Sequence, residues 1–193
     1  MEEEYTGKTE TRFNSPIPML MKLRDTIFGK LRPDLYTRIT AYISLLIWII
    51  FLSWHIISYF AISFRDVIRT EKKVDVEALI YNRAAQLGFN PETFLQQLLN
   101  YHLISAICWG VVFIGIVFLW RKMRVFALFL LGGVAVYYGL LLFYMGFRYF
   151  NEDTTLFDKI LLAVLTGIAL LYFLLLKSKK KMPVEDIGSD EII

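Results

Sequence analysis

Two histidines are the residues of this sequence best suited to chemistry inside a membrane. His55 follows Trp54 in a long apolar segment, and His102 follows Tyr101 at the start of another. Two imidazoles on neighbouring helices can bind one haem iron as axial ligands. They can equally donate or accept an interhelical hydrogen bond.

The expected depths of the two histidines favour the hydrogen bond. His55 lies nine residues before the end of its apolar segment, which is about 13 Å along a helix. His102 lies at the boundary of its own segment, so the two rings are expected at different levels. We therefore predict an interhelical hydrogen bond for His55 and an ordinary interfacial position for His102. Haem binding by His55 and His102 stays a weak alternative.

No other motif for catalysis or metal binding is found. The sequence has no His-Glu-x-x-His, no Cys-x-x-Cys and no glycine-rich phosphate loop. The single cysteine, Cys108, lies in an apolar segment and is expected to pack as a small side chain. We predict no catalytic residue, no metal site and no cofactor, and hence a protein that is not an enzyme.

The elements that position these residues are four apolar segments. The chain of 193 residues is 56% hydrophobic, and none of its 21 Lys and Arg or 18 Asp and Glu residues lies in these segments. Each segment is close to the roughly 20 residues that cross a bilayer as a helix. The predicted fold is therefore all-α: a polytopic integral membrane protein with a four-transmembrane-helix bundle. The spans are expected at about 39–64, 103–120, 125–147 and 160–176, within a transmembrane domain of residues 39–176.

Ionisable groups inside a membrane usually mark proton relays, intramembrane proteases and ion-coupled carriers. Their absence from the four segments argues against these classes. Aromatic residues near the segment ends, such as Tyr101 and Tyr149, are typical of interfacial belts. Those inside the segments are expected to pack or contact lipid, although they could line a ligand pocket; they are Trp48, Trp54, Trp109, Tyr137, Tyr138 and Tyr144.

Both ends of the chain carry basic clusters next to a span. In the tail 1–38, residues 19–28 form a basic amphipathic segment that Gly29 can end. Such a helix is expected at the membrane interface, and docking to a cytoplasmic partner is the alternative. The tail 177–193 is basic and then acidic. The residues predicted to contact lipid headgroups are Lys22, Arg24, Lys30, Lys177, Lys179, Lys180 and Lys181.

The loop 65–102 carries signals for two helices. Asp75 can cap the first, and Gly88 can end it. Asn90 before Pro91 can start the second, which is expected to continue into the second span. We predict a short outer helical hairpin at this position.

The distribution of Lys and Arg predicts that both termini face the cytoplasm. With this orientation fourteen Lys and Arg residues lie inside and seven lie outside. We expect the protein in a bacterial cytoplasmic (inner) membrane.

Small residues recur along one side of the third span. We call these residues the small-residue stripe: Gly132, Ala135, Gly139 and Gly146. Small residues let helix backbones approach closely in a bilayer, so another helix is expected along this stripe. The second span, with Ala106 and Gly110, is a candidate from within the chain, and a partner subunit is the alternative. Leu141 is expected on another side of the helix. Replacing Leu141 by alanine should therefore loosen the bundle or release the partner much less than replacing Gly139 by leucine.

These features favour a non-catalytic integral membrane subunit that scaffolds or regulates a larger membrane protein complex. A small transporter or channel for a neutral or hydrophobic solute is the first alternative, and a haem-binding redox subunit is the second. The expected partners are the lipid bilayer and other membrane protein subunits, with no nucleic acid.

Overall fold

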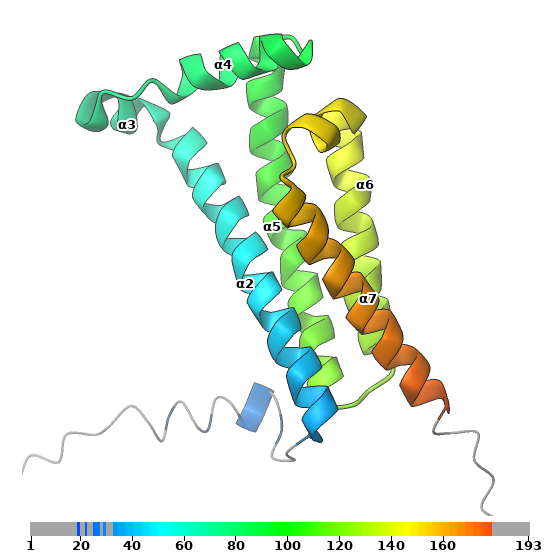
Figure 1. Cartoon of the computed structure of the whole chain (residues 1–193). Helices are drawn as coiled ribbons and strands as arrows, with labels where there is room; N and C mark the ends of the chain where they lie inside the picture. Colours follow the sequence, from blue (N-terminus) through cyan, green and yellow to red (C-terminus); the bar gives the residue numbers. More distant parts are fainter. Residues whose placement is uncertain (1–18, 20–21, 23–24, 28, 30–32, 179–193) are drawn as a thin grey trace, which may run out of the picture. The chain divides into compact units, whose positions relative to one another are not determined.

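The structure is a computed structural model that describes residues 33–178 together with residues 19, 22, 25–27 and 29. The chain divides into two units, Met1–Arg32 and Pro33–Ile193. In the second unit every described element is a helix (Figure 1). The helices are α2 (Leu35–Ser63), α3 (Arg65–Lys72), α4 (Val76–Leu87), α5 (Pro91–Trp120), α6 (Phe126–Glu152) and α7 (Leu156–Ser178).

Four of these helices, α2, α5, α6 and α7, are long and apolar enough to span a membrane. The prediction of an all-helical integral membrane protein with four such helices is therefore confirmed. Each helix begins or ends beyond the charge-free segment from which it was predicted; α5, for example, begins at Pro91 and not at Leu103.

The local signals for helix ends are seen at the predicted residues. The Asp75 carboxylate accepts a hydrogen bond from the Ala78 backbone N–H at 3.0 Å and caps α4. Gly88 ends α4 at a φ of +80°, a conformation that favours glycine. Asn90 caps α5 by accepting from the Glu92 N–H at 3.1 Å. Helix α3 was not predicted, and it ends at Lys73 with a φ of +55°.

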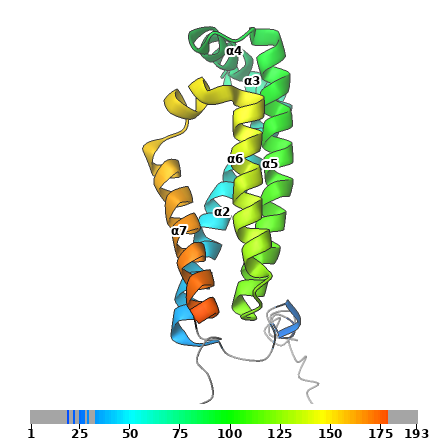
Figure 2. The same cartoon turned by 90° about the vertical axis from the view of Figure 1, so that its right-hand side faces the viewer.

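The closest helix contact in the unit joins α5 and α6, which lie side by side (Figure 2). A Cβ placed on Gly115 would lie 2.6 Å from the Leu130 backbone nitrogen. A Cβ on Gly133 would lie 2.6 Å from a methyl carbon of Val112. The absence of side chains at Gly115 and Gly133 therefore sets the distance between the two backbones.

The small-residue stripe does not form this contact. A Cβ on Gly132, Gly139 or Gly146 would meet nothing within 4 Å, and Ala135 is exposed. Gly110 of α5 is equally open, so the prediction that the second span lies along the stripe is wrong. The stripe is also not continuous, because Gly146 has a non-helical φ of 73° and ψ of 171° that kinks α6. A helix from a partner subunit stays the untested alternative.

Leu141 lies on the side of α6 that does contact the rest of the unit. Its side chain is 1% exposed and belongs to the core. The expectation that Leu141 is the less important position is therefore wrong for the stability of this unit.

Helix α7 packs against α2 and α6. The hydroxyls of Thr37 on α2 and Tyr172 on α7 are 2.7 Å apart, which joins the two helices near one end of the unit. At the other end Thr155 and Asp158 form a capping box, because the Asp158 carboxylate accepts from the Thr155 N–H and the Thr155 hydroxyl accepts from the Asp158 N–H. This box fixes where α7 begins.

Polar contacts connect neighbouring segments at both ends of the unit. At the end where α2 begins, the Lys122 ammonium lies 2.5 Å from the Asp34 carboxylate. Hydrogen bonds from Lys122 and then Thr37 lower the pKa of Asp34 to about 2, so this carboxyl is ionised at neutral pH. At the opposite end Arg83 of α4 pairs with Asp153, and Arg148 of α6 donates to the Leu87 carbonyl at 2.9 Å.

Several predicted features lie largely outside the described residues. The amphipathic segment 19–28 is described only in part, and in that unit Gly29 has a φ of +84°. Lys22 is exposed. Arg24, Lys30, residues 179–193 and the side chain of Lys177 are not described, so the headgroup contacts stay predictions.

Candidate functional site

The two histidines lie against each other at the contact between α2 and α5. The Nδ1 atoms of His55 and His102 are 3.0 Å apart, and the residues are 1% and 4% exposed. Helical spacing explains this position: His55 follows Ile47 and Phe51 on the buried side of α2, and His102 precedes Ser105 and Trp109 on that of α5. The predicted interhelical hydrogen bond of His55 is thus confirmed, with His102 as its partner.

The expected difference in depth between the histidines is wrong. His102 follows eleven residues of α5 that begin at Pro91, and it is buried in the helix contact. The prediction places the membrane surface at the start of the charge-free segment. Because α5 extends as a helix well before that point, His102 can lie level with His55.

The observed pair does not hold an iron between its two Nδ1 atoms. Imidazole nitrogens bind metals at about 2 Å, so two ligands on opposite sides of one ion are about 4 Å apart. The Nδ1 atoms are only 3.0 Å apart and bond directly to each other. Among the residues described, no group of three or more His, Cys, Asp or Glu side chains could hold a metal ion.

Two tyrosines complete this cluster. The Tyr101 hydroxyl donates to the Tyr137 hydroxyl of α6 at 3.1 Å. The His55 ring stands edge-on to both, with ring centroids 5.4 Å from Tyr101 and 5.5 Å from Tyr137. Both tyrosines are buried inside the unit. We call His55, His102, Tyr101 and Tyr137 the polar floor.

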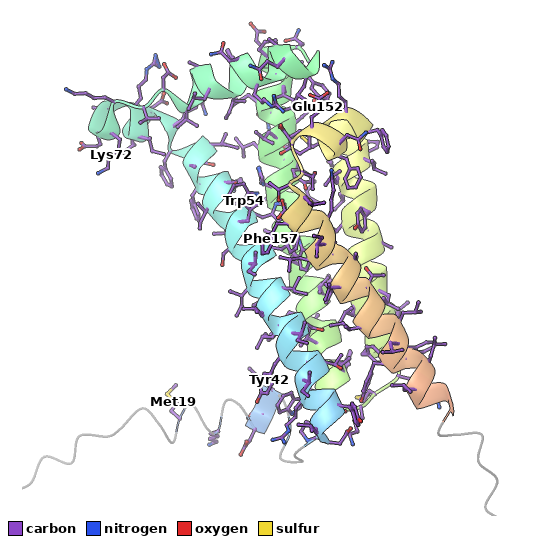
Figure 3. The ribbon with its side chains drawn as sticks, viewed as in Figure 1. Met19, Tyr42, Trp54, Lys72, Glu152 and Phe157 are labelled. Atoms are coloured by element: carbon purple, nitrogen blue, oxygen red, sulfur yellow. The ribbon has the colours of Figure 1, made fainter. Side chains whose placement is uncertain are left out.

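The polar floor lines a cavity of about 390 Å³. Its other walls come from α2, from the end of α6 and from the start of α7. Trp54 and Ile57 of α2 and Phe157 of α7 line it while remaining largely exposed. Figure 3 shows Trp54 and Phe157 beside each other in one view. The volume lies in the lower part of the range of about 300–1,000 Å³ that is usual for small-molecule sites.

The polar floor has hydrogen-bond donors and acceptors that no described residue pairs with. Nε2 of His55 is buried and has no hydrogen-bond partner among the described residues. In a pair of neutral imidazoles one Nδ1 donates and the other accepts, so one ring keeps an Nε2–H donor and the other a bare Nε2 acceptor. The Tyr137 hydroxyl accepts from Tyr101 and so keeps its own proton to donate. A buried polar atom without a partner costs about 1–3 kcal/mol.

The charged groups at the cavity are carboxylates that already have partners. Asp153 is paired with Arg83, and Asp158 accepts from the Thr155 hydroxyl at 2.7 Å. No Lys or Arg side chain lines the cavity in the described part of the chain. Among the described residues the site therefore offers no cation for an anionic ligand, and its one carboxylate without a basic partner, Asp158, is held by Thr155.

Comparisons with protein-family models, with curated proteins and with solved structures find no match for this chain. The cavity is therefore the feature of the described residues that points to a function. Of the aromatic residues that the sequence offered as pocket residues, Trp54 and Tyr137 line it. The histidine pair and Tyr101 were not predicted there, because their meeting depends on how α2 and α5 are offset along their axes.

Proposed function

We propose that the chain is a non-catalytic integral membrane protein that binds a small uncharged solute in the cavity between α2, α5, α6 and α7. The observation that carries this proposal is a cavity of about 390 Å³ lined by the buried polar floor, in which Nε2 of His55 has no partner among the described residues. Binding sites are typically apolar cavities with a few placed polar groups. Because of this cavity we favour solute binding, as in a carrier or a sensor. The sequence alone favours a scaffolding role.

The proposal includes an orientation with both termini in the cytoplasm of a bacterial cell. It rests on the fourteen-to-seven distribution of Lys and Arg. In this orientation α3, α4 and the start of α5 lie at the outer surface, and α4 with the start of α5 is the predicted helical hairpin. A cysteine at Asn82 in a Cys108→Ala background should react with an impermeant thiol reagent in intact cells. Labelling only after lysis would show that the protein has the opposite orientation.

The proposal predicts that a bulky residue at the cavity wall prevents a bound molecule from co-purifying. Ile57 lines the cavity and Ile56 does not, although both are exposed, at 63% and 39%. We expect the natural protein and I56W, gently extracted, to carry the same small molecule in native mass spectrometry. I57W should carry at least about tenfold less. Equal amounts in both variants, or no bound molecule in any preparation, would contradict the proposal.

A non-catalytic subunit of a larger membrane complex is the second candidate. Its support is the outer side of α6, where Gly132 and Gly139 leave space that no described residue fills. Small residues are common where transmembrane helices from two subunits meet. The same gentle extraction tests this candidate: a stoichiometric partner protein that G139L fails to retain supports it. Recovery of the chain without any partner under several mild detergents counts against it.

A further inference from the structure

The cavity extends from the polar turn before α7, at Asp153, Thr155 and Asp158, to the exposed side chain of Trp54 on α2. Trp54 lies within three residues of the middle of the charge-free segment Ile39–Phe64, about 4 Å along the helix axis. The hydrocarbon core reaches about 15 Å to each side of its centre. Trp54 is 64% exposed and Phe157 is 58% exposed, and both line the cavity. An apolar ligand can therefore enter on the Trp54 side, between α2 and α7, as well as at the polar turn.

A molecule that arrives from hydrocarbon must be uncharged or nearly so, because an isolated charge there is costly. The cavity agrees with this requirement for anions, since no described Lys or Arg lines it; of its two carboxylates, Asp153 is paired with Arg83 and Asp158 is held by the Thr155 hydroxyl. A phospholipid headgroup, with its phosphate anion, finds no donor of positive charge among the described lining residues. Ionic lipids and free anions are thereby disfavoured.

The polar floor selects the chemical group that binds at its end of the cavity. The Tyr137 hydroxyl proton and one imidazole Nε2–H are donors suited to a carbonyl oxygen. Phe51, Tyr101 and Tyr137 bring aromatic rings to the wall, and Trp54 and Phe157 bring two more to its lipid side. Aromatic rings favour planar ligands through stacked and edge-to-face contacts.

We infer that the cavity binds the ring of a lipid-soluble quinone, with its ring oxygens against Tyr137 and the histidine pair and its apolar tail leaving between Trp54 and Phe157. The inference rests on the proposed function and names the ligand class of the same site. A volume of about 390 Å³ accommodates one substituted ring with the start of a tail. It is too small for a two-chain lipid.

Thermal unfolding of the purified full chain in detergent, with decylubiquinone as the probe, tests this inference. A ligand that binds only the folded state raises the melting temperature and does so saturably. Decylbenzene has the same tail and a ring without oxygens, so it is the matched control ligand. Tyr137→Phe removes one donor, and Tyr144→Phe makes the same change on α6 outside the cavity.

We expect decylubiquinone to raise the melting temperature saturably and decylbenzene to have no saturable effect. Y137F should weaken the apparent affinity about fivefold, the value of one hydrogen bond, while Y144F should leave it unchanged. An equal effect of decylbenzene, or equal affinities of Y137F and the natural protein, would overturn the inference, as would no effect of the quinone. If the molecule that co-purifies with I56W has no ring oxygens, the proposed function stands and the quinone inference fails.

Discussion

Replacing Gly115 by leucine should abolish the packing of α5 on α6. A single Cβ at Gly115 would lie 2.6 Å from the Leu130 nitrogen and 2.9 Å from its Cα. Backbone atoms cannot rotate away as a flexible side chain can, so the two helices must separate. Overpacking of a well-packed contact costs about 1–3 kcal/mol, and a leucine against backbone should exceed about 3 kcal/mol.

The same substitution at Gly139 is the control. A Cβ at Gly139 meets nothing within 4 Å, so leucine adds no clash inside the unit. It also improves the helix propensity by up to about 1 kcal/mol. Reversible unfolding in mixed micelles should therefore show a severe loss for G115L and no loss for G139L. Equal destabilisation by the two variants would mean that α5 and α6 do not pack as described.

The sequence could not tell which glycines of α6 face another helix. Gly132 and Gly133 are neighbours and point about 100° apart, yet the first meets open space and the second meets Val112. In a soluble helix the polar side would identify the exposed face. In a membrane the lipid-facing side is as apolar as the core, so regular spacing of glycines is a weak guide to contact.

The histidine pair shows a second limit of the same kind. The absence of charge identifies the helical segments well, which is why the four long helices of the described unit could be predicted. It does not identify where a helix begins. The first twelve residues of α5, from Pro91 to His102, precede its charge-free segment. The relative offset of α2 and α5 comes from side-chain packing between them, which no single segment encodes.

Signals that act within a few residues were more reliable. Asp75, Gly88 and Asn90 act at the helix ends where the sequence places them. Each depends on the backbone of its own turn: a carboxylate or amide accepts from an N–H two or three residues on, and a glycine adopts a positive φ. The polar floor, in contrast, combines residues from α2, α5 and α6 and could be recognised only after folding.

Replacing Trp109 by alanine should be the most damaging truncation of a side chain in the core of this unit. Trp109 is fully buried, stacks on Phe51 with ring centroids 4.7 Å apart and lies 5.4 Å from the Tyr137 ring. Removal of a buried tryptophan costs about 3–5 kcal/mol through lost contacts and a residual cavity. The indole N–H of Trp109 has no partner among the described residues, so its removal returns part of this cost. We therefore expect about 3 kcal/mol.

Trp54→Ala is the matched control, because Trp54 lies on α2 at the cavity with 64% of its surface exposed. Its loss should change the free energy of unfolding by about 0.5 kcal/mol or less, as for other exposed positions.

Trp109 also supports the wall on which Phe51 and Tyr137 rest, so W109A should lose ligand together with stability. W54A should keep its stability and weaken only ligand retention, since it removes one side of the opening. Equilibrium unfolding of both variants, with native mass spectrometry of the bound molecule, separates the two effects. A W109A protein as stable as W54A would show that the contact between α2, α5 and α6 is not the core of this unit.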